Sequence, residues 1–176
     1  ADSPYGCALE VLVGHVRTVR AAVAVPVAVA DDWRYWSRPQ SRTLAREVDA
    51  ILVHAHPLWS GQQLTGAVPW LEARLAELQA LHPDRPVVIG ETGWATDAAP
   101  VGEQAELIAG ATGEQEQAAF YHASRRWAEQ DRIAVLTFEA FDENWKGSDH
   151  PREVEKHWGL FRADRTPKAA LAGRGE

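Results

Sequence analysis

The chain alternates short apolar segments with longer segments of helical periodicity, and this alternation limits the possible folds more than any other feature. Segments rich in β-branched residues are predicted to be strands at 25–31, 51–59, 86–94 and 133–141. Helical patterns are found at 7–22, 41–49, 68–82 and 114–130. Such alternation predicts successive βα units on a parallel sheet, and hence an α/β fold with a single domain over residues 1–176.

Two of the predicted helices have a clear local signature. In the segment 68–82, Leu71, Leu75 and Leu78 fall on one face, with Leu81 at its edge, and Glu77 points to the opposite side. The segment 114–130 follows a glycine and opens with an acidic first turn, which suits the amino end of a helix. Both segments are therefore predicted to be helices, the first with one apolar face.

Polar side chains collect where each predicted strand ends. They are Asp31 and Asp32, His54 and His56, Glu91, and the group Glu139, Asp142 and Glu143. Because the carboxyl ends of parallel strands meet at one edge of a sheet, we expect a single polar rim, as in barrel enzymes and open α/β sheets. The segment 95–112, rich in Ala, Gly and Pro, is predicted to be a long loop at this rim.

Composition excludes several classes of partner. A net charge of −7, without a basic stripe, argues against binding to nucleic acid or to an anionic membrane. The single cysteine, Cys7, cannot form an internal disulfide, so the redox compartment stays open. The longest apolar run, at 21–30, is too short to span a bilayer and contains Pro26, so the sequence as given is expected to carry no anchor and no signal peptide.

Several longer motifs resemble one enzyme family. "VVIGETGWAT" at 87–96, "TFEAFDENWKG" at 137–147 and "EKHWGLFRADRTPKAAL" at 155–171 are similar, in this order, to the carboxyl half of glycoside hydrolase family 17. That family contains β-1,3-glucanases and bacterial β-1,3-glucanosyltransferases. "VPVAVADDW" at 25–33 and "VHAHPLWSG" at 53–61 resemble the two preceding barrel strands of the bacterial members.

The resemblance implies a fold and a set of roles. It implies half of a (β/α)₈ TIM-type barrel, its strands corresponding to the fifth to eighth of the family barrel, and retaining chemistry. Glu91 falls on the nucleophile, and Glu139, Glu143 and Lys146 fall on the polar group that supports the nucleophile and the sugar. Trp59 and Trp94 match aromatic positions near the cleft.

The chain departs from the family pattern at two points. Leu58 stands where the family has a tyrosine, so a phenol hydroxyl is lost. The family's acid/base glutamate lies in a "GNE" motif that this sequence does not contain, and Glu10, within a helical pattern, is a poor substitute. A half-barrel also leaves edge strands and one sheet face uncovered, so we expect completion by an N-terminal half or by a second copy.

Retaining cleavage needs two carboxyl groups about 5–5.5 Å apart, one as nucleophile and one as acid. Glu91 is the best nucleophile candidate because a strand end fixes it, and the nearby carboxyls that could serve as acid are Glu143 and Glu139, given a raised pKa. The alternatives stay open: Glu91 as a helix cap or surface carboxylate, and Glu139 and Glu143 in a rim salt bridge with Lys146 or Arg162.

The remaining candidates concern the substrate. We expect binding by Asp31, His54, Trp59, Trp94, Trp145 and Lys146. His54 and His56 alternate along a strand, but without a third ligand a hydrogen-bonding role is favoured over a metal, so no metal and no cofactor is expected. Of the eight tryptophans, Trp70 and Trp127 are predicted to pack within helices. The others follow strand ends, where flat rings stack on sugars: Trp33, Trp36, Trp59, Trp94, Trp145 and Trp158.

The sequence therefore favours a retaining glycoside hydrolase or transglycosylase acting on β-1,3-glucan. Two alternatives remain: a glucan-binding remnant without catalysis, and an inactive half-barrel scaffold lacking the acid. The expected partners are a β-glucan oligosaccharide or polysaccharide, together with a homodimer mate or an N-terminal half-barrel. The resemblance favours an extracytoplasmic location, periplasmic or secreted.

Overall fold

The computed structural model describes residues 6–172 of the chain. They form two compact units: the first contains the chain up to Ala55 and the segment Ala73–Gly90, and the second contains His56–Glu72 and the chain from Glu91 onwards. Within residues 6–172, no helix has the length and apolar character needed to cross a membrane. That these units behave as one domain stays a prediction.

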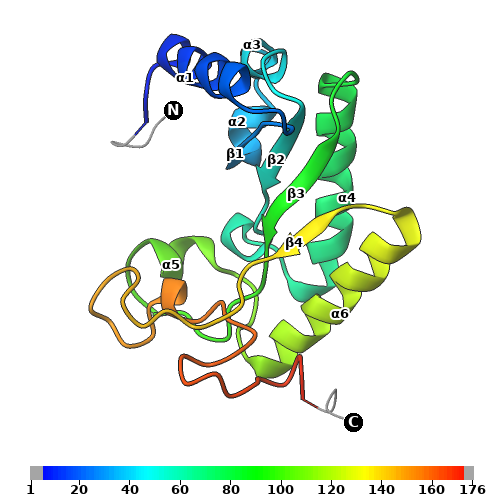
Figure 1. The fold of residues 1–176 in the computed structure, drawn as a ribbon. Coiled ribbons are helices and arrows are strands. Elements are labelled where there is room, and N and C mark those ends of the chain that lie inside the picture. Colours follow the sequence, from blue (N-terminus) through cyan, green and yellow to red (C-terminus); the bar gives the residue numbers. More distant parts are fainter. Residues whose placement is uncertain (1–5, 173–176) are drawn as a thin grey trace. The chain divides into compact units, whose positions relative to one another are not determined.

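Helices and strands alternate along the chain, as the sequence predicts (Figure 1). The first half of the chain contains α1 (Leu9–Ala22), β1 (Ala28–Asp32), α2 (Trp33–Trp36), α3 (Ser41–Ala45), β2 (Ala50–His54) and the short helix η1 (Leu58–Ser60). The second half contains α4 (Leu64–Leu81), β3 (Val87–Thr92), α5 (Gly102–Leu107), α6 (Glu114–Asp131), β4 (Val135–Thr137) and the short helix η2 (Val154–Lys156).

The strands form one sheet in the order β1-β2-β3-β4, which is the order of the chain. β1 and β2 are parallel, with Ala28 opposite Ala50 and Asp32 opposite His54. Four parallel strands joined by helices confirm the predicted α/β class. Each strand is shorter than its apolar segment: β1 begins later, at Ala28, and the segments of β2, β3 and β4 continue into polar and aromatic residues beyond the strand.

The first unit packs one face of its strands. Ile51, Val53 and Ile89 are buried, whereas Leu52, which lies between the first two on β2, is only half-buried. Trp36 is fully buried, and its carbonyl oxygen accepts hydrogen bonds from Ser41 Oγ and from His82 Nε2, both at 2.9 Å. These bonds attach α3 and the end of α4 to the segment that follows β1.

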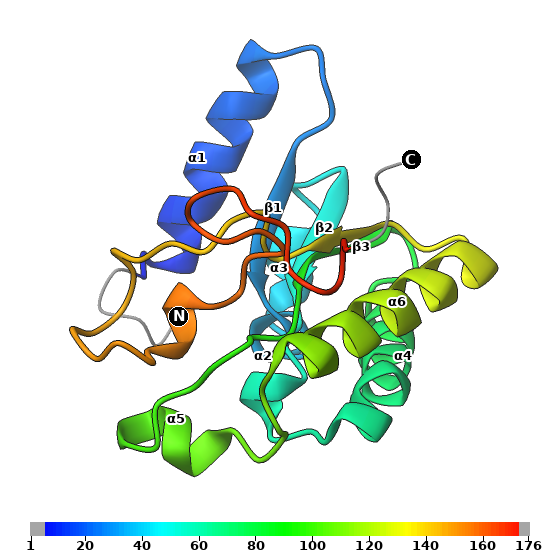
Figure 2. The ribbon, with the colours of Figure 1, turned by 90° about the horizontal axis from the view of Figure 1, so that it is seen from below.

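The second unit is held by a buried amide on α6. Gln117 Nε2 donates to the carbonyl oxygens of Trp94, Trp158 and Gly159 at 2.9, 3.2 and 3.1 Å. One side chain thus satisfies backbone groups from two loops that are far apart in the sequence. Figure 2 shows that the long segment after β4 contains little regular structure apart from one short helical turn.

The helices differ from the sequence prediction in several places, and α3 ends at Ala45 where the sequence predicts a helix to residue 49. α4 begins at Leu64, upstream of the predicted start at residue 68, and it carries Pro69 within its early turns. A proline lacks the N–H that would bond the carbonyl four residues earlier, so Pro69 removes one hydrogen bond from α4. The structure also contains the short helix α2 directly after β1, and α5 within the predicted loop 95–112.

The uneven burial of β2 can be tested with two neighbouring substitutions. We expect Ile51→Ala to lower the free energy of unfolding by about 2–5 kcal/mol, because it deletes a fully buried side chain. Leu52→Ala, at a half-buried position, should lower the free energy of unfolding by clearly less. Urea unfolding followed by circular dichroism measures both, and equal losses would mean that the second face of β2 is covered in solution.

Candidate functional site

Glu91 is the penultimate residue of β3, and its side chain is 32% exposed. The backbone behind it is tightly packed. The N–H of Phe138 donates to the carbonyl oxygen of Thr92 at 2.7 Å, and a Cβ atom added to Gly93 would collide with the carbonyl oxygen of Phe138. The residue after Thr92 must therefore be glycine, and the carboxylate is held on rigid backbone.

A histidine lies beside this carboxylate. His56 Nε2 is 3.4 Å from Glu91 Oε2, and the imidazole ring is 15% exposed. From the sequence, His54 was predicted to bind substrate. The structure adds His56 to the candidate residues. Both histidines were visible in the sequence, and the period of two along a strand could not decide which of them would meet Glu91.

Two further carboxyls share one lysine. Lys146 Nζ lies 2.8 Å from Glu139 Oε2, forms an ion pair with Glu143, and sits 4.8 Å from the centre of the Phe138 ring. The structure thus brings together three of the predicted residues, in the ion pair that the sequence offered as the alternative. Arg162 instead pairs with Glu114.

The electrostatics of this cluster follow from burial. Burial raises the pKa of Glu139, and the nearby Glu143 adds to this effect, while the hydrogen bond from Lys146 opposes it. Burial lowers the pKa of Lys146, but its bonds to both carboxylates outweigh this and leave the pKa raised. Glu139 is therefore a carboxyl that holds its proton to higher pH than usual, beside a lysine that stays charged.

The tryptophans expected at the rim separate into two groups. Trp145 is 76% exposed, and the indole N–H of Trp59 donates to Glu155 Oε1 at 3.1 Å. Trp94 is buried, with its ring 5.5 Å from that of Phe120 and its N–H donated to the carbonyl oxygen of Ala111 at 2.9 Å. The expectation that Trp94 stacks on a sugar is therefore wrong in this structure, because packing occupies its ring.

Other tryptophans follow the same division. Trp36 and Trp158 are buried, so they pack in the interior and are not open stacking surfaces. Trp33 is half-buried, with the guanidinium of Arg34 4.9 Å from the centre of its ring. Trp127 is buried in α6, as predicted, and Trp70 in α4 is half-buried.

Asp31 and His54 belong to the first unit. Asp31 lies near the end of β1, and its Oδ1 accepts the N–H of Asp32 at 2.7 Å. Burial, together with the negative charge of Asp31, raises the pKa of the Tyr35 phenol. His54 ends β2, opposite Asp32. Their roles in substrate binding remain predictions.

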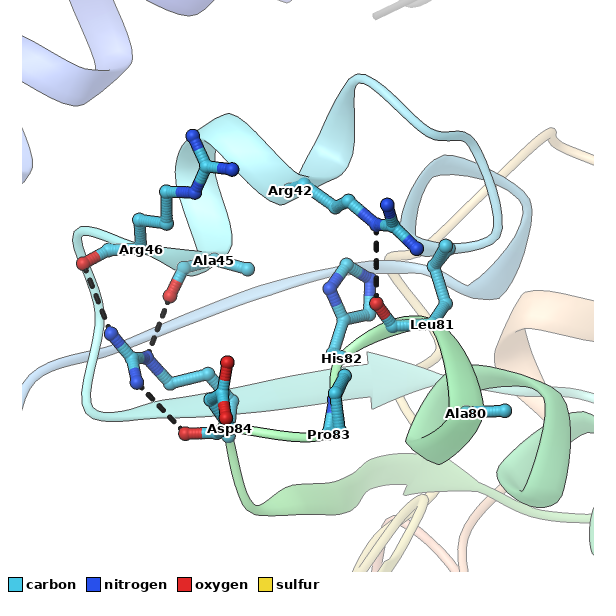
Figure 3. Close-up of a pocket in the computed structure, with 9 residues that line it drawn as sticks. Arg42, Ala45, Arg46, Ala80, Leu81, His82, Pro83 and Asp84 are labelled. Carbon is cyan, nitrogen blue, oxygen red and sulfur yellow. Dashed lines mark hydrogen bonds between the residues drawn. The ribbon is translucent and has the colours of Figure 1, made fainter.

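A separate pocket of about 300 Å³ lies in the first unit, between the ends of α3 and α4 (Figure 3). Its arginines bind backbone oxygens: Arg42 Nε donates to Leu81, and Arg85 donates to Ala45 and Arg46. Cationic side chains commonly satisfy the last carbonyls of helices in this way. The residues that line this pocket come before β2 and β3 in the chain, whereas the predicted catalytic residues come at or after the ends of strands.

Metal binding finds no support within residues 6–172. No group of three or more histidine, cysteine, aspartate or glutamate side chains is placed there to hold a metal ion. Glu91 instead pairs with His56, and Glu139, which pairs with Lys146, has a raised pKa. Two carboxylates in different environments suit general acid and nucleophilic chemistry.

The comparison with protein families decides the affiliation. The model of the BtgE/BtgC glycoside hydrolase domain matches residues 5–159. The chain belongs to this family. The BtgE/BtgC match covers most of the sequence and includes Glu91, His56 and the cluster around Lys146.

Curated relatives of this BtgE/BtgC domain are described as glucan 1,3-beta-glucosidases. The Schizosaccharomyces pombe protein is 30% identical over 174 residues, which cover 92% of this chain and 52% of the relative. The Candida albicans protein BGL2 is 28% identical over 155 residues, covering 84% of this chain and 48% of the relative. The BtgE/BtgC chain thus spans about half the length of these relatives.

Solved structures show the same fold. A family 17 β-1,3-glucanosyltransferase from Rhizomucor miehei matches with a TM-score of 0.79 and 24% identity, covering 93% of this chain and 57% of that protein. An endo-laminarinase from Formosa matches with a TM-score of 0.75 and 24% identity, covering 91% of this chain and 50% of the other. The BtgE/BtgC chain therefore has the fold of half a TIM-type barrel.

The raised pKa of Glu139 predicts a pH dependence of stability. The folded state holds this proton more tightly than the unfolded state, so stability should fall as pH rises from about 4.5 through the folded pKa, and then level off. We expect Glu139→Gln to remove this decline. Urea unfolding at several pH values between 4 and 8 measures it, with Glu103→Gln on exposed α5 as the control. If the free energy of unfolding changed with pH in the same way in wild type and in Glu139→Gln, the raised pKa would not belong to Glu139.

Proposed function

We propose that this BtgE/BtgC domain acts on β-1,3-glucan as a retaining glycoside hydrolase or transglycosylase. The observation that carries the proposal is Glu91, fixed near the end of β3 and paired with His56, in a chain of this family. The names of the relatives support the substrate, since they are glucan 1,3-beta-glucosidases. A mutant of the Rhizomucor miehei enzyme, at 24% identity and a TM-score of 0.77, is described in complex with laminaritriose.

The proposed reaction has two displacements. The Glu91 carboxylate attacks the anomeric carbon, the glycosidic C–O bond breaks, and the departing oxygen takes a proton from the acid. A covalent glycosyl ester on Glu91 results. Water or the hydroxyl of a second glucan then attacks the same carbon and gives its proton to the acid residue, now a base, which releases Glu91. Water yields hydrolysis, and a glucan acceptor yields transglycosylation.

Glu139 is the better of the two carboxyls proposed as acid. An acid must keep its proton near neutral pH, and burial moves the pKa of Glu139 in this direction. Glu143 would help to hold Lys146, whose charge steadies the cluster. Phe138 contacts both parts of the site: its ring centre lies 5.4 Å from that of His56 and 4.8 Å from Lys146 Nζ.

The substrate would be bound by exposed and half-buried groups around this cluster. Trp145, 76% exposed and next to Lys146, offers the most open aromatic face for a sugar ring. Trp59 is proposed as a second aromatic contact, fixed by its bond to Glu155. Lys146 would supply hydrogen bonds to hydroxyl groups, and Asp31 and His54 of the first unit remain substrate-binding residues expected from the sequence alone.

The nucleophile can be tested by substitution. We expect Glu91→Gln to abolish release of reducing sugar from laminarin, with a loss of at least about 10³-fold, because an amide cannot form the glycosyl ester. Glu106→Gln, on exposed α5, serves as the matched control. A wild-type protein that binds laminarin without turnover would support the binding remnant instead, and one that neither binds nor reacts would support the inactive scaffold.

We also propose that the open sheet is completed by a second copy of this chain. Four strands cannot close a barrel, Leu52 is only half-buried on β2, and Leu136 on β4 is 57% exposed. In a two-fold pair, the partner's sheet would cover these positions. It would also bring a further carboxyl, the partner's Glu139, toward Glu91.

Sedimentation equilibrium tests this arrangement directly. We expect a dimer, and a well-folded monomer at assay concentrations would exclude the second copy and favour a separate N-terminal half-barrel. Mixing Glu91→Gln with Glu139→Gln identifies which chain supplies the acid. If the partner chain supplies the acid, the mixture should show about a quarter of wild-type activity. Half of randomly formed dimers contain one chain of each variant, and one of the two sites in each such dimer is intact. Acid from the same chain restores nothing.

A further inference from the structure

His56 is the side chain that the structure adds to the site. It directly follows Ala55 at the start of the second unit, and its Nε2 faces Glu91 Oε2 at 3.4 Å. The ring is 15% exposed, whereas the carboxylate is 32% exposed. The contact is therefore shielded on the histidine side and more open on the side of the carboxylate.

Aromatic contacts fix the plane of the imidazole. The ring centre of His56 lies 5.4 Å from that of Phe138, at an interplanar angle of 83°, and 5.0 Å from that of Trp158, at 64°. Phe138 and Trp158 also meet edge to face, at 5.9 Å. Edge contacts of this kind hold an aromatic ring in one orientation.

The backbone fixes these two aromatic rings in turn. Phe138 donates its N–H to Thr92, the residue after Glu91, and Glu139 donates its N–H to the carbonyl oxygen of Trp158 at 3.3 Å. The rings that hold His56 are thus attached to both strand ends that carry the proposed catalytic carboxyls. The direction of Nε2 is set by the same backbone that places Glu91.

The hydrogen-bonding pattern assigns the proton. A carboxylate can only accept, so the bond to Glu91 requires a hydrogen on Nε2. Nδ1 is buried and has no hydrogen-bond partner, so nothing around it favours a proton on that nitrogen. The ring is therefore suited to the tautomer with hydrogen on Nε2.

We propose that His56 is a positioning residue for Glu91, donating from Nε2 to orient the carboxylate and to keep it ionised. This inference rests on the proposed role of Glu91 as nucleophile. The last torsion of a glutamate is broad, so a fixed donor on one oxygen selects one orientation of the group. A hydrogen bond to the charged form also favours that form over the protonated one.

The kinetic test uses a glycoside whose leaving group needs no protonation, such as 2,4-dinitrophenyl β-laminaribioside. We expect His56→Phe, which keeps an aromatic ring but lacks the donor, to slow formation of the glycosyl-enzyme roughly 10- to 100-fold. The acid limb of the pH–rate profile should move to higher pH. KM should change little, and His56→Gln, which keeps a donor, should recover part of the rate.

Matched controls separate this role from a structural one. His15→Gln, on exposed α1, should leave the rate and the pH profile unchanged. Circular dichroism reports whether each variant folds. An unchanged rate in His56→Phe, or a slower rate with an unmoved acid limb and no recovery in His56→Gln, would overturn the proposal.

A second readout does not depend on turnover. Nitrogen-15 NMR of the imidazoles should show His56 with hydrogen on Nε2 in the wild type, and its signals should shift in Glu91→Gln. A hydrogen on Nδ1 would overturn the proposal. Mass spectrometry after treatment with a 2-deoxy-2-fluoro glycosyl donor tests Glu91 itself. A wild type whose Glu91 is not labelled counts against the proposed nucleophile, while the NMR result still decides whether His56 donates to it.

Discussion

The packing of Phe138 against the end of β3 is the contact on which the site depends. Its N–H binds Thr92, its ring meets the imidazole of His56, and its other face lies near the ammonium of Lys146. One aromatic residue thus separates two polar groups, a histidine with a carboxylate and a lysine with two carboxylates. Both groups lie in the second unit, and burial raises the pKa of Glu139 in the group that contains Lys146.

The strand alternation made much of this arrangement predictable. Apolar runs that end in polar residues locate Glu91 near the carboxyl end of β3 and Glu139 just beyond β4, and both follow from chain order and the parallel sheet. The spacing from Glu143 to Lys146 also made an ion pair between them predictable. These features are local or follow from strand direction, so they need no knowledge of packing.

Features that depend on tertiary contacts could not be predicted from the sequence. Nothing in "GETGW" says that Trp94 turns into the interior against Phe120, since an indole after a strand suits either a cleft or a core. His54 and His56 are two residues apart, and the sequence does not tell which of them contacts Glu91; in the structure β2 ends at His54, and His56 beyond it makes the contact. The sequence predicted a helix from residue 68, yet α4 begins at Leu64 and continues through Pro69.

Gly93 shows how closely the backbones of the two strand ends approach, since no side chain fits between it and the carbonyl of Phe138. The location of the carboxylate is therefore a property of main-chain spacing, which surface substitutions scarcely alter. Substitutions in the surrounding loops can therefore change the groups near the carboxylate while the backbone that carries Glu91 keeps its place.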